Sequence, residues 1–314
     1  GVPEDVKSSF QQCDLPTWTL RLLSQVRGVR GTEIPGLLVN TFGGYSASRA
    51  NPQWIAVVGR DVAALVERLL QAGLAERESE LIHLTLLGRA CGASSLSFES
   101  GLRLVELMKQ LNAAQTPPTQ VLAMVQALDE MDAIYTPVMK RGRSESVRAN
   151  DVAQRYGHPM TQALQRYCRD EIEFWCRCKR AALLYDWFEG TPVDVLERRF
   201  STTPFGGAIG YGKIIGIADT TRFHLRSTHQ ILSALFPDQP TFLAGLDEVL
   251  QRLEFGLPGG ALPLTNLPLS LTRGQYLGLF NAGCLTSEAV NDLSGERLEA
   301  CIGRTSASLL RRRA

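Results

Sequence analysis

Residues 213–235 contain the side chains whose types and spacing point most directly to chemistry. At ~100° per residue, one side of a helix over this segment collects apolar and small residues: Ile214, Ile217, Ala218, Thr221, Leu225, Thr228, Leu232 and Leu235, with Ile231 at its margin. The opposite side collects polar residues around one aromatic: Gly216, Asp219, Thr220, Phe223, Arg226, Ser227 and Gln230. The spacing therefore places an aromatic ring at the centre of a polar helix face.

An aromatic ring among hydrogen-bonding residues is suited to stacking on nucleobases, which contributes ~1–3 kcal/mol per base and tolerates any base sequence. Arg222 and Arg226 lie beside Phe223 and could contact phosphates, and Gly216 would let a strand approach closely. The alternative is that Phe223 packs on a neighbouring helix, because a central helix of a bundle can be buried on all sides. Periodicity alone favours this packing alternative.

A second candidate for phosphate contact is the densest basic cluster of the sequence. It comprises Lys140, Arg141, Arg143 and Arg148. A solvated loop is the default interpretation of such a cluster, and phosphate contact is the second.

The motifs of the common catalytic classes do not occur. A phosphate-binding loop needs Gly-x-x-x-x-Gly-Lys-Ser/Thr, but the only Gly-Lys pair is Gly212-Lys213. Two acidic runs, at residues 129–132 and 170–173, lie in helical periodicity, so we expect both to be solvated helix faces. Cys168, Cys176 and Cys178 have no histidine at ligand spacing. We therefore expect no metal, no cofactor and no catalysis by this chain alone.

Length and composition are those of a globular protein. The chain has 314 residues, 33 Lys and Arg against 32 Asp and Glu, and 44% hydrophobic residues. This balance excludes a disordered chain and a histone-like basic arm, but a neutral total can hide a basic channel. No apolar run reaches the ~18 residues of a membrane span, and residues 1–7 are not a signal peptide. Seven cysteines without framework spacing indicate an intracellular protein.

The order of elements predicts a mainly α fold in three parts. Helices over 15–26, 32–42 and 61–72, followed by extended runs 74–77 and 81–85, predict a winged-helix domain over residues 1–92, with 43–59 as an extended loop. Residues 93–256 read as a helical bundle, in which 160–189 should bend or break once. Residues 257–314 contain several short helices, among them 294–302.

Several short motifs follow one another in an order that resembles the Ski-two-like superfamily 2 helicases. They are residues 40–42 (NTF), 69–74 (LLQAGL), 84–90 (LTLLGRA), 179–190 (KRAALLYDWFEG), Gly212 with 217–225, and 279–283 (LFNAG). The resemblance is greatest to archaeal fork-repair DNA helicases and to the helicase half of DNA polymerase theta. It implies a winged helix, a helical ratchet bundle and a C-terminal helix-hairpin-helix domain.

The same resemblance implies that the chain is the C-terminal accessory region of an ATP-dependent DNA helicase. ATP and Mg would then belong to upstream motor domains, and single-stranded DNA would follow the ratchet helix at 213–235. The family's stacking tryptophan falls on Phe223, and a second stacking residue, an arginine, falls on Gly216. The hairpin of the helix-hairpin-helix falls on residues 267–271, which lack glycine, so we expect packing there rather than phosphate binding.

Two alternatives stay open at this point. RNA could replace DNA, because base stacking does not distinguish the two sugars. The region could instead be a helicase-derived protein-interaction module whose partners are other repair or defence proteins. The expected location is intracellular, cytoplasmic in a prokaryote and nuclear in a eukaryote.

Overall fold

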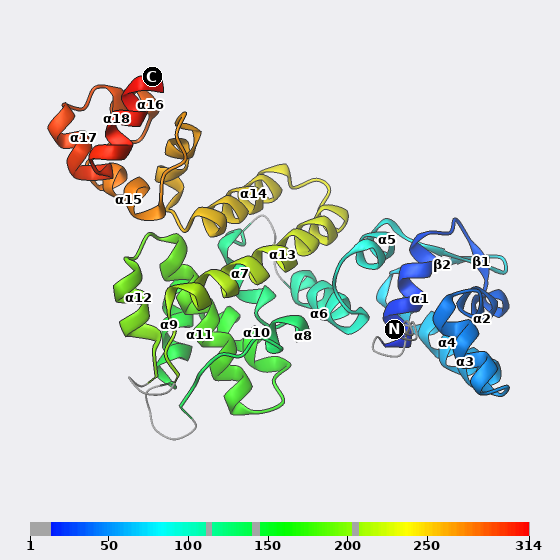
Figure 1. The fold of residues 1–314 in the computed structure, drawn as a ribbon. Coiled ribbons are helices and arrows are strands. Elements are labelled where there is room, and N and C mark those ends of the chain that lie inside the picture. The colour runs from blue at the N-terminus through cyan, green and yellow to red at the C-terminus, as the bar shows by residue number, and fades with distance from the viewer. Residues whose placement is uncertain (1–13, 111–114, 140–144, 203–206, 314) are drawn as a thin grey trace, which may run out of the picture. The chain divides into compact units, whose positions relative to one another are not determined.

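The computed structural model describes residues 14–110, 115–139, 145–202 and 207–313, and these residues are mainly helical (Figure 1). The chain divides into two compact units. One comprises Gly1–Ala113 with Ser227–Gln239, and the other comprises Ala114–Arg226 with Pro240–Ala314. Among the described helices, none has the length and apolar character needed to cross a membrane.

The first unit contains helices and one small antiparallel sheet. Its elements are α1 (Leu15–Ser24), β1 (Val29–Arg30), η2 (Gly31–Glu33), α2 (Ile34–Val39), α3 (Phe42–Ala50), α4 (Trp54–Ala72), β2 (Ala75–Glu78), β3 (Leu81–Leu84), α5 (Leu86–Ala93) and α6 (Phe98–Lys109). The strand order is β1-β3-β2. The two extended runs predicted after the third helix are therefore confirmed as a hairpin, with Ala75 opposite Leu84.

The hairpin follows from local sequence signals at both of its ends. Gly73 ends α4 in the left-handed conformation, with φ 73°, which a residue with a side chain adopts only at a cost. After β3, the Thr85 hydroxyl accepts a hydrogen bond from the Gly88 amide and caps α5. The buried face of α4, which includes Val62, Leu65 and Leu69, covers the core of this unit.

Two predictions for this unit are wrong. The single helix expected over 32–42 is divided into η2 and α2, and the loop expected over 43–59 is mostly helical, because it contains α3 and the start of α4. The Thr41 hydroxyl accepts a hydrogen bond from the Gly44 amide at 3.0 Å and starts α3. A Cβ on Gly44 would lie 1.9 Å from the Leu38 carbonyl oxygen. This glycine therefore permits close packing inside a helix instead of interrupting it.

The second unit is a helical bundle followed by shorter helices. Its elements are α7 (Thr119–Val125), α8 (Asp129–Asp132), α9 (Val147–Tyr156), α10 (His158–Arg166), α11 (Glu171–Phe188), α12 (Val193–Phe200), the first part of α13 (Tyr211–Leu235), α14 (Pro240–Phe255), η3 (Gly259–Asn266), α15 (Arg273–Asn281), α16 (Ser287–Asn291), α17 (Gly295–Ile302) and α18 (Arg304–Arg313). The last residues of α13, from Ser227, belong to the first unit.

The predicted break within 160–189 is confirmed. It separates α10 from α11, and the Asp170 carboxylate caps α11 by accepting a hydrogen bond from the Glu173 amide at 2.8 Å. Buried alanines and leucines at 181–184 then make α11 the central helix of the bundle.

The C-terminal helices pack around a core of their own within this unit. Its residues are Leu257, Ala261, Leu264, Leu267, Leu271, Tyr276, Leu279, Cys284, Val290, Leu298, Ile302, Ala307 and Leu310. Ser294 caps α17, as its position in the sequence predicts. The arginines at 311–313 form the last turn of α18.

Candidate nucleic-acid interface

The polar face of α13 is exposed where the sequence pattern places it. Phe223 has 56% of its surface exposed, and Gly216, Asp219, Arg226 and Gln230 are also exposed. The opposite side is buried at every predicted position except Leu235, which is half-buried. The packing alternative for Phe223 is therefore wrong, because no helix covers its ring among the described residues.

Ser227 is an exception to this pattern. It was placed on the polar face, but it is 8% exposed. Its hydroxyl lies 2.8 Å from the Ser95 hydroxyl and accepts a hydrogen bond from the Ser95 amide at 3.2 Å. Ser227 thus belongs to the packing of the first unit and not to the exposed face.

The Phe223 ring is supported from within its own helix. The ring of His224 meets it edge-on, with ring centroids 5.1 Å apart and an interplanar angle of 76°. Burial lowers the pKa of His224, and the nearby Glu130 carboxylate acts weakly in the opposite direction. The imidazole is therefore neutral near pH 7, and one edge of the Phe223 ring rests on an uncharged group.

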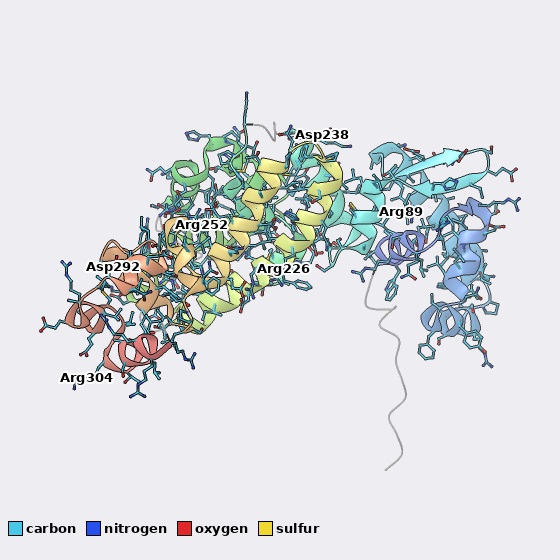
Figure 2. All side chains as sticks on the ribbon, turned by 90° about the horizontal axis from the view of Figure 1, so that it is seen from above. Arg89, Arg226, Asp238, Arg252, Asp292 and Arg304 are labelled. Atoms are coloured by element: carbon cyan, nitrogen blue, oxygen red, sulfur yellow. The ribbon has the colours of Figure 1, made fainter. Side chains whose placement is uncertain are left out.

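The two arginines beside Phe223 have different surroundings. Arg222 forms an ion pair with Glu254 of α14, with 2.7 Å between Nη1 and Oε2, and a longer one with Asp219 at 3.5 Å. Arg226 has no hydrogen bond or ion pair among the described residues, and its position on α13 is labelled in Figure 2. Arg226 is therefore the arginine that is free to meet an anion, whereas Arg222 already has two carboxylate partners.

The remaining predicted residues of this face differ in how much they are engaged. The Thr220 hydroxyl donates a hydrogen bond to the Gly216 carbonyl at 2.9 Å, one turn back along α13. A Cβ on Gly216 would meet nothing within 4 Å. Gln230 is exposed. The face thus offers an open backbone, one amide side chain, one guanidinium and one ring.

The predicted basic cluster falls largely outside the described residues. Lys140, Arg141 and Arg143 all lie there. Arg148, at the edge of the cluster, is bound into the bundle: it pairs with Asp151 at 2.9 Å and donates to the Arg199 carbonyl.

A buried network of charged and polar residues holds the buried side of α13, and sequence reasoning missed it. Asp132 of α8 accepts hydrogen bonds from Arg177 and Arg180 of α11, both of which are buried. Arg180 also donates to the Gln126 side-chain oxygen at 3.1 Å, and the Gln126 amide donates to the Thr221 hydroxyl of α13 at 3.2 Å. A chain of polar contacts therefore connects the core of the bundle to the buried side of α13.

The network corrects the prediction that both acidic runs are solvated. Burial raises the pKa of Asp132, and hydrogen bonds and charge from its two arginines act in the opposite direction. Glu173 is also largely covered; burial opposes its ionisation, but hydrogen bonds from Arg169 bring its pKa down to about 2. The signal in the sequence was the pair of arginines three residues apart on an otherwise apolar helix, because such charges need buried partners.

The C-terminal helices also contain a feature that the sequence reading missed. Leu267 and Leu271 of the expected hairpin are buried, which agrees with packing there. A different helix-turn-helix occurs between α17 and α18, at Gly303, whose φ is 79°. The side chain of Arg304, which begins α18, is 87% exposed. Across the described parts of the chain, no group of three or more His, Cys, Asp or Glu is arranged to hold a metal ion.

Comparison with known proteins finds a distant relationship to a helicase. No protein-family model matches the chain. Over 150 residues the chain is 24% identical to the ATP-dependent DNA helicase Hel308 of Pyrobaculum calidifontis. The alignment covers 48% of this chain and 19% of the helicase. This similarity supports a relationship to Ski-two-like helicases and a helicase-related role.

Proposed function

We propose that the chain is the C-terminal accessory region of an ATP-dependent DNA helicase and guides single-stranded DNA along α13. The observation that carries the proposal is the exposed Phe223 ring at the centre of a polar helix face. ATP and Mg would be bound by motor domains preceding this region, and those domains would be its protein partners.

The similarity to a DNA helicase and the order of the elements both support this proposal. In the first unit a helix, a short strand, further helices and a two-stranded hairpin follow one another, with the short strand paired to the hairpin. That order is expected of a winged helix. The α17–α18 turn at Gly303 supports a helix-hairpin-helix in the C-terminal part.

In the proposed mechanism, one base of the strand stacks on Phe223 between strokes of the motor. Arg226, one turn further along α13, contacts a phosphate, and Gln230 donates to or accepts from the strand. At Gly216 the strand approaches the helix backbone closely. Because the buried Thr221 hydroxyl ties α13 to the bundle through Gln126, the ring keeps a fixed position while the motor moves the strand past it.

Binding of a fluorescently labelled single-stranded oligonucleotide to the chain, followed by anisotropy, tests this function. We expect binding whose affinity falls with salt, because phosphate contacts release counterions. Phe223→Ala should weaken binding by ~1–3 kcal/mol, the range for one base stacked on an aromatic side chain. Phe42→Ala is the matched control, because Phe42 is 57% exposed and belongs to α3 of the first unit, not to α13.

The outcomes separate the alternatives. Absence of binding at low salt would overturn the proposal and favour a protein-interaction module. Equal loss in both phenylalanine variants would remove the specific role of Phe223. Competition between DNA and RNA oligonucleotides of the same sequence decides the nucleic acid, because only RNA carries the 2′-hydroxyl.

A further inference from the structure

A cavity of about 290 Å³ lies beside the polar face of α13 within the second unit. It is formed where the end of α11, the first half of α13, the end of α14 and the start of α15 meet. Aromatic side chains supply part of the lining, namely Tyr211, Phe255 and Tyr276. Flat apolar walls of this kind suit a planar ring.

The cavity is one helical turn from Phe223. Asp219 belongs both to its lining and to the exposed face of α13. Four residues separate Asp219 from Phe223, which corresponds to ~6 Å along the helix axis. A base neighbouring one that stacks on Phe223 can therefore reach the cavity without a large extension of the strand.

The charged groups left open in the cavity are carboxylates, which accept hydrogen bonds, and the hydroxyls of Tyr211, Thr272 and Tyr276 in the lining can both donate and accept. Arg273 is in the lining, but its donors are already occupied by the carbonyls of Gly256, Trp187 and Thr191, at 2.7 to 2.9 Å. The guanidinium also stacks on the Trp187 ring, 4.2 Å from its centroid. Asp219 and Glu254 are exposed, and within the described part of the chain both pair with Arg222, so carboxylate oxygens remain accessible.

We propose that this cavity receives a nucleobase and favours bases that carry an exocyclic amino group. The inference rests on the proposed function and adds a preference among bases to it. Cytosine presents an amino donor at its fourth ring position, which a carboxylate accepts. Uracil and thymine present a carbonyl oxygen at the same position, which meets the carboxylates of Asp219 and Glu254 with like polarity. The one donor on their edge is the N3–H, which lies between two carbonyl oxygens.

The sharpest test compares oligodeoxycytidine with oligodeoxyuridine of equal length, because their bases differ in the donor and acceptor pattern of one edge and not in size. Each labelled oligonucleotide is titrated with the 314-residue chain at fixed salt and pH. We expect the cytidine strand to bind about fivefold more tightly, at the lower end of the discrimination that one good base contact provides.

Two variants and a matched control assign the preference to the cavity. In Asp219→Asn and Glu254→Gln the amide can donate as well as accept, so the preference for cytidine should fall to less than twofold. Each change also removes one of the two carboxylate partners of Arg222, so binding of both strands should strengthen. Glu248→Gln removes the same charge from an exposed position of α14 outside the cavity lining, and it should leave the preference unchanged.

Each outcome has a distinct meaning. If neither strand binds, the proposed function itself fails. If both bind with equal affinity, the cavity has no base preference and this inference fails while the proposed function stands. If the preference persists in both carboxylate variants, or falls equally in Glu248→Gln, it has another origin and the assignment to this cavity is overturned.

Discussion

Two helices of the second unit reverse the usual distribution of residues, and they do so in opposite ways. In α11, Arg177, Lys179 and Arg180 are buried, whereas in α13 Phe223 is exposed. Every buried cation of α11 has a partner: Asp132 for the two arginines, and Glu145 for Lys179 at 2.9 Å. The exposed ring of α13 is contacted edge-on by the adjacent His224 and is otherwise open.

This difference between the two helices indicates that the buried charges of α11 serve the fold and that the exposed ring of α13 serves binding. A buried charge that is fully hydrogen-bonded inside the protein needs nothing from outside. An exposed aromatic at the centre of a polar face has no such internal reason. We therefore assign α11 to architecture and α13 to recognition, and the following variants test that division.

The largest expected effect is on stability, at Asp132. Asp132→Ala removes the carboxylate that contacts both Arg177 and Arg180, while Glu173 stays 3.4 Å from Arg177. Loss of one partner of a buried ion pair costs ~3–5 kcal/mol. Urea unfolding measures the change. Asp194→Ala is the control, because the Asp194–Arg198 pair is exposed on both sides and such pairs contribute ~0–1 kcal/mol. Similar losses in the two variants would mean that the α11 network is not structural.

The next expected effect is a loss of binding with no loss of stability. Phe223→Ala should weaken single-strand binding by ~1–3 kcal/mol. Its free energy of unfolding, measured in urea, should change by no more than the ~0.5 kcal/mol typical of surface substitutions. Phe223→Trp should keep the affinity, because it keeps a ring that can stack. A large loss of stability in Phe223→Ala would reverse the assignment of α13.

A smaller gain is expected from Gly216, the position at which the resemblance to Ski-two-like helicases implies an arginine. Gly216→Arg meets open space and should add one phosphate contact, which steepens the dependence of log affinity on log salt by ~0.7. Gly216→Ala separates the helix effect from the charge effect: it should stabilise α13 by up to ~1 kcal/mol without changing the slope. An unchanged slope in the arginine variant would place the strand away from this turn.

The smallest effect is a pH dependence from His224. Its pKa is below the ordinary value of ~6.5 because of burial, so the unfolded chain binds a proton more readily than the folded one. The contribution of His224 to the free energy of unfolding is fully present above the unfolded pKa and is lost as the pH falls through the folded pKa. The free energy of unfolding in urea should therefore differ less between pH 5 and pH 7.5 in His224→Gln than in the wild type. The two differences should be separated by ~1 kcal/mol or less. Identical differences would contradict the burial of an uncharged ring beneath Phe223.

Features set by local periodicity could be predicted from the sequence. The polar and apolar sides of α13 follow from the rotation of ~100° per residue in a helix. Gly73 marks the end of α4 by its left-handed backbone, and Ser294 marks the start of α17 by its capping hydroxyl. The exposure of Phe223 belongs to this class, although its packing alternative could be excluded only by the positions of neighbouring helices.

Features that depend on distant residues could not be predicted. Asp132 looks like a solvated acid in its own helix, and its partners lie 45 and 48 residues away. The engagement of Arg222 by Glu254 depends on how α14 lies against α13. The loop predicted over 43–59 includes Gly44, which lies inside α3 and packs so close to the Leu38 carbonyl that no side chain would fit.

The stacked Trp187–Arg273 pair has a practical consequence for experiments. The indole nitrogen donates to the Leu253 carbonyl at 3.0 Å, and the ring is nearly inaccessible to water under the guanidinium. Because Arg273 begins α15 and Trp187 lies in the last turn of α11, undocking of α15 would hydrate the indole and shift its emission to longer wavelength. Trp187, one of four tryptophans in the chain, thus reports whether α15 is seated on the bundle.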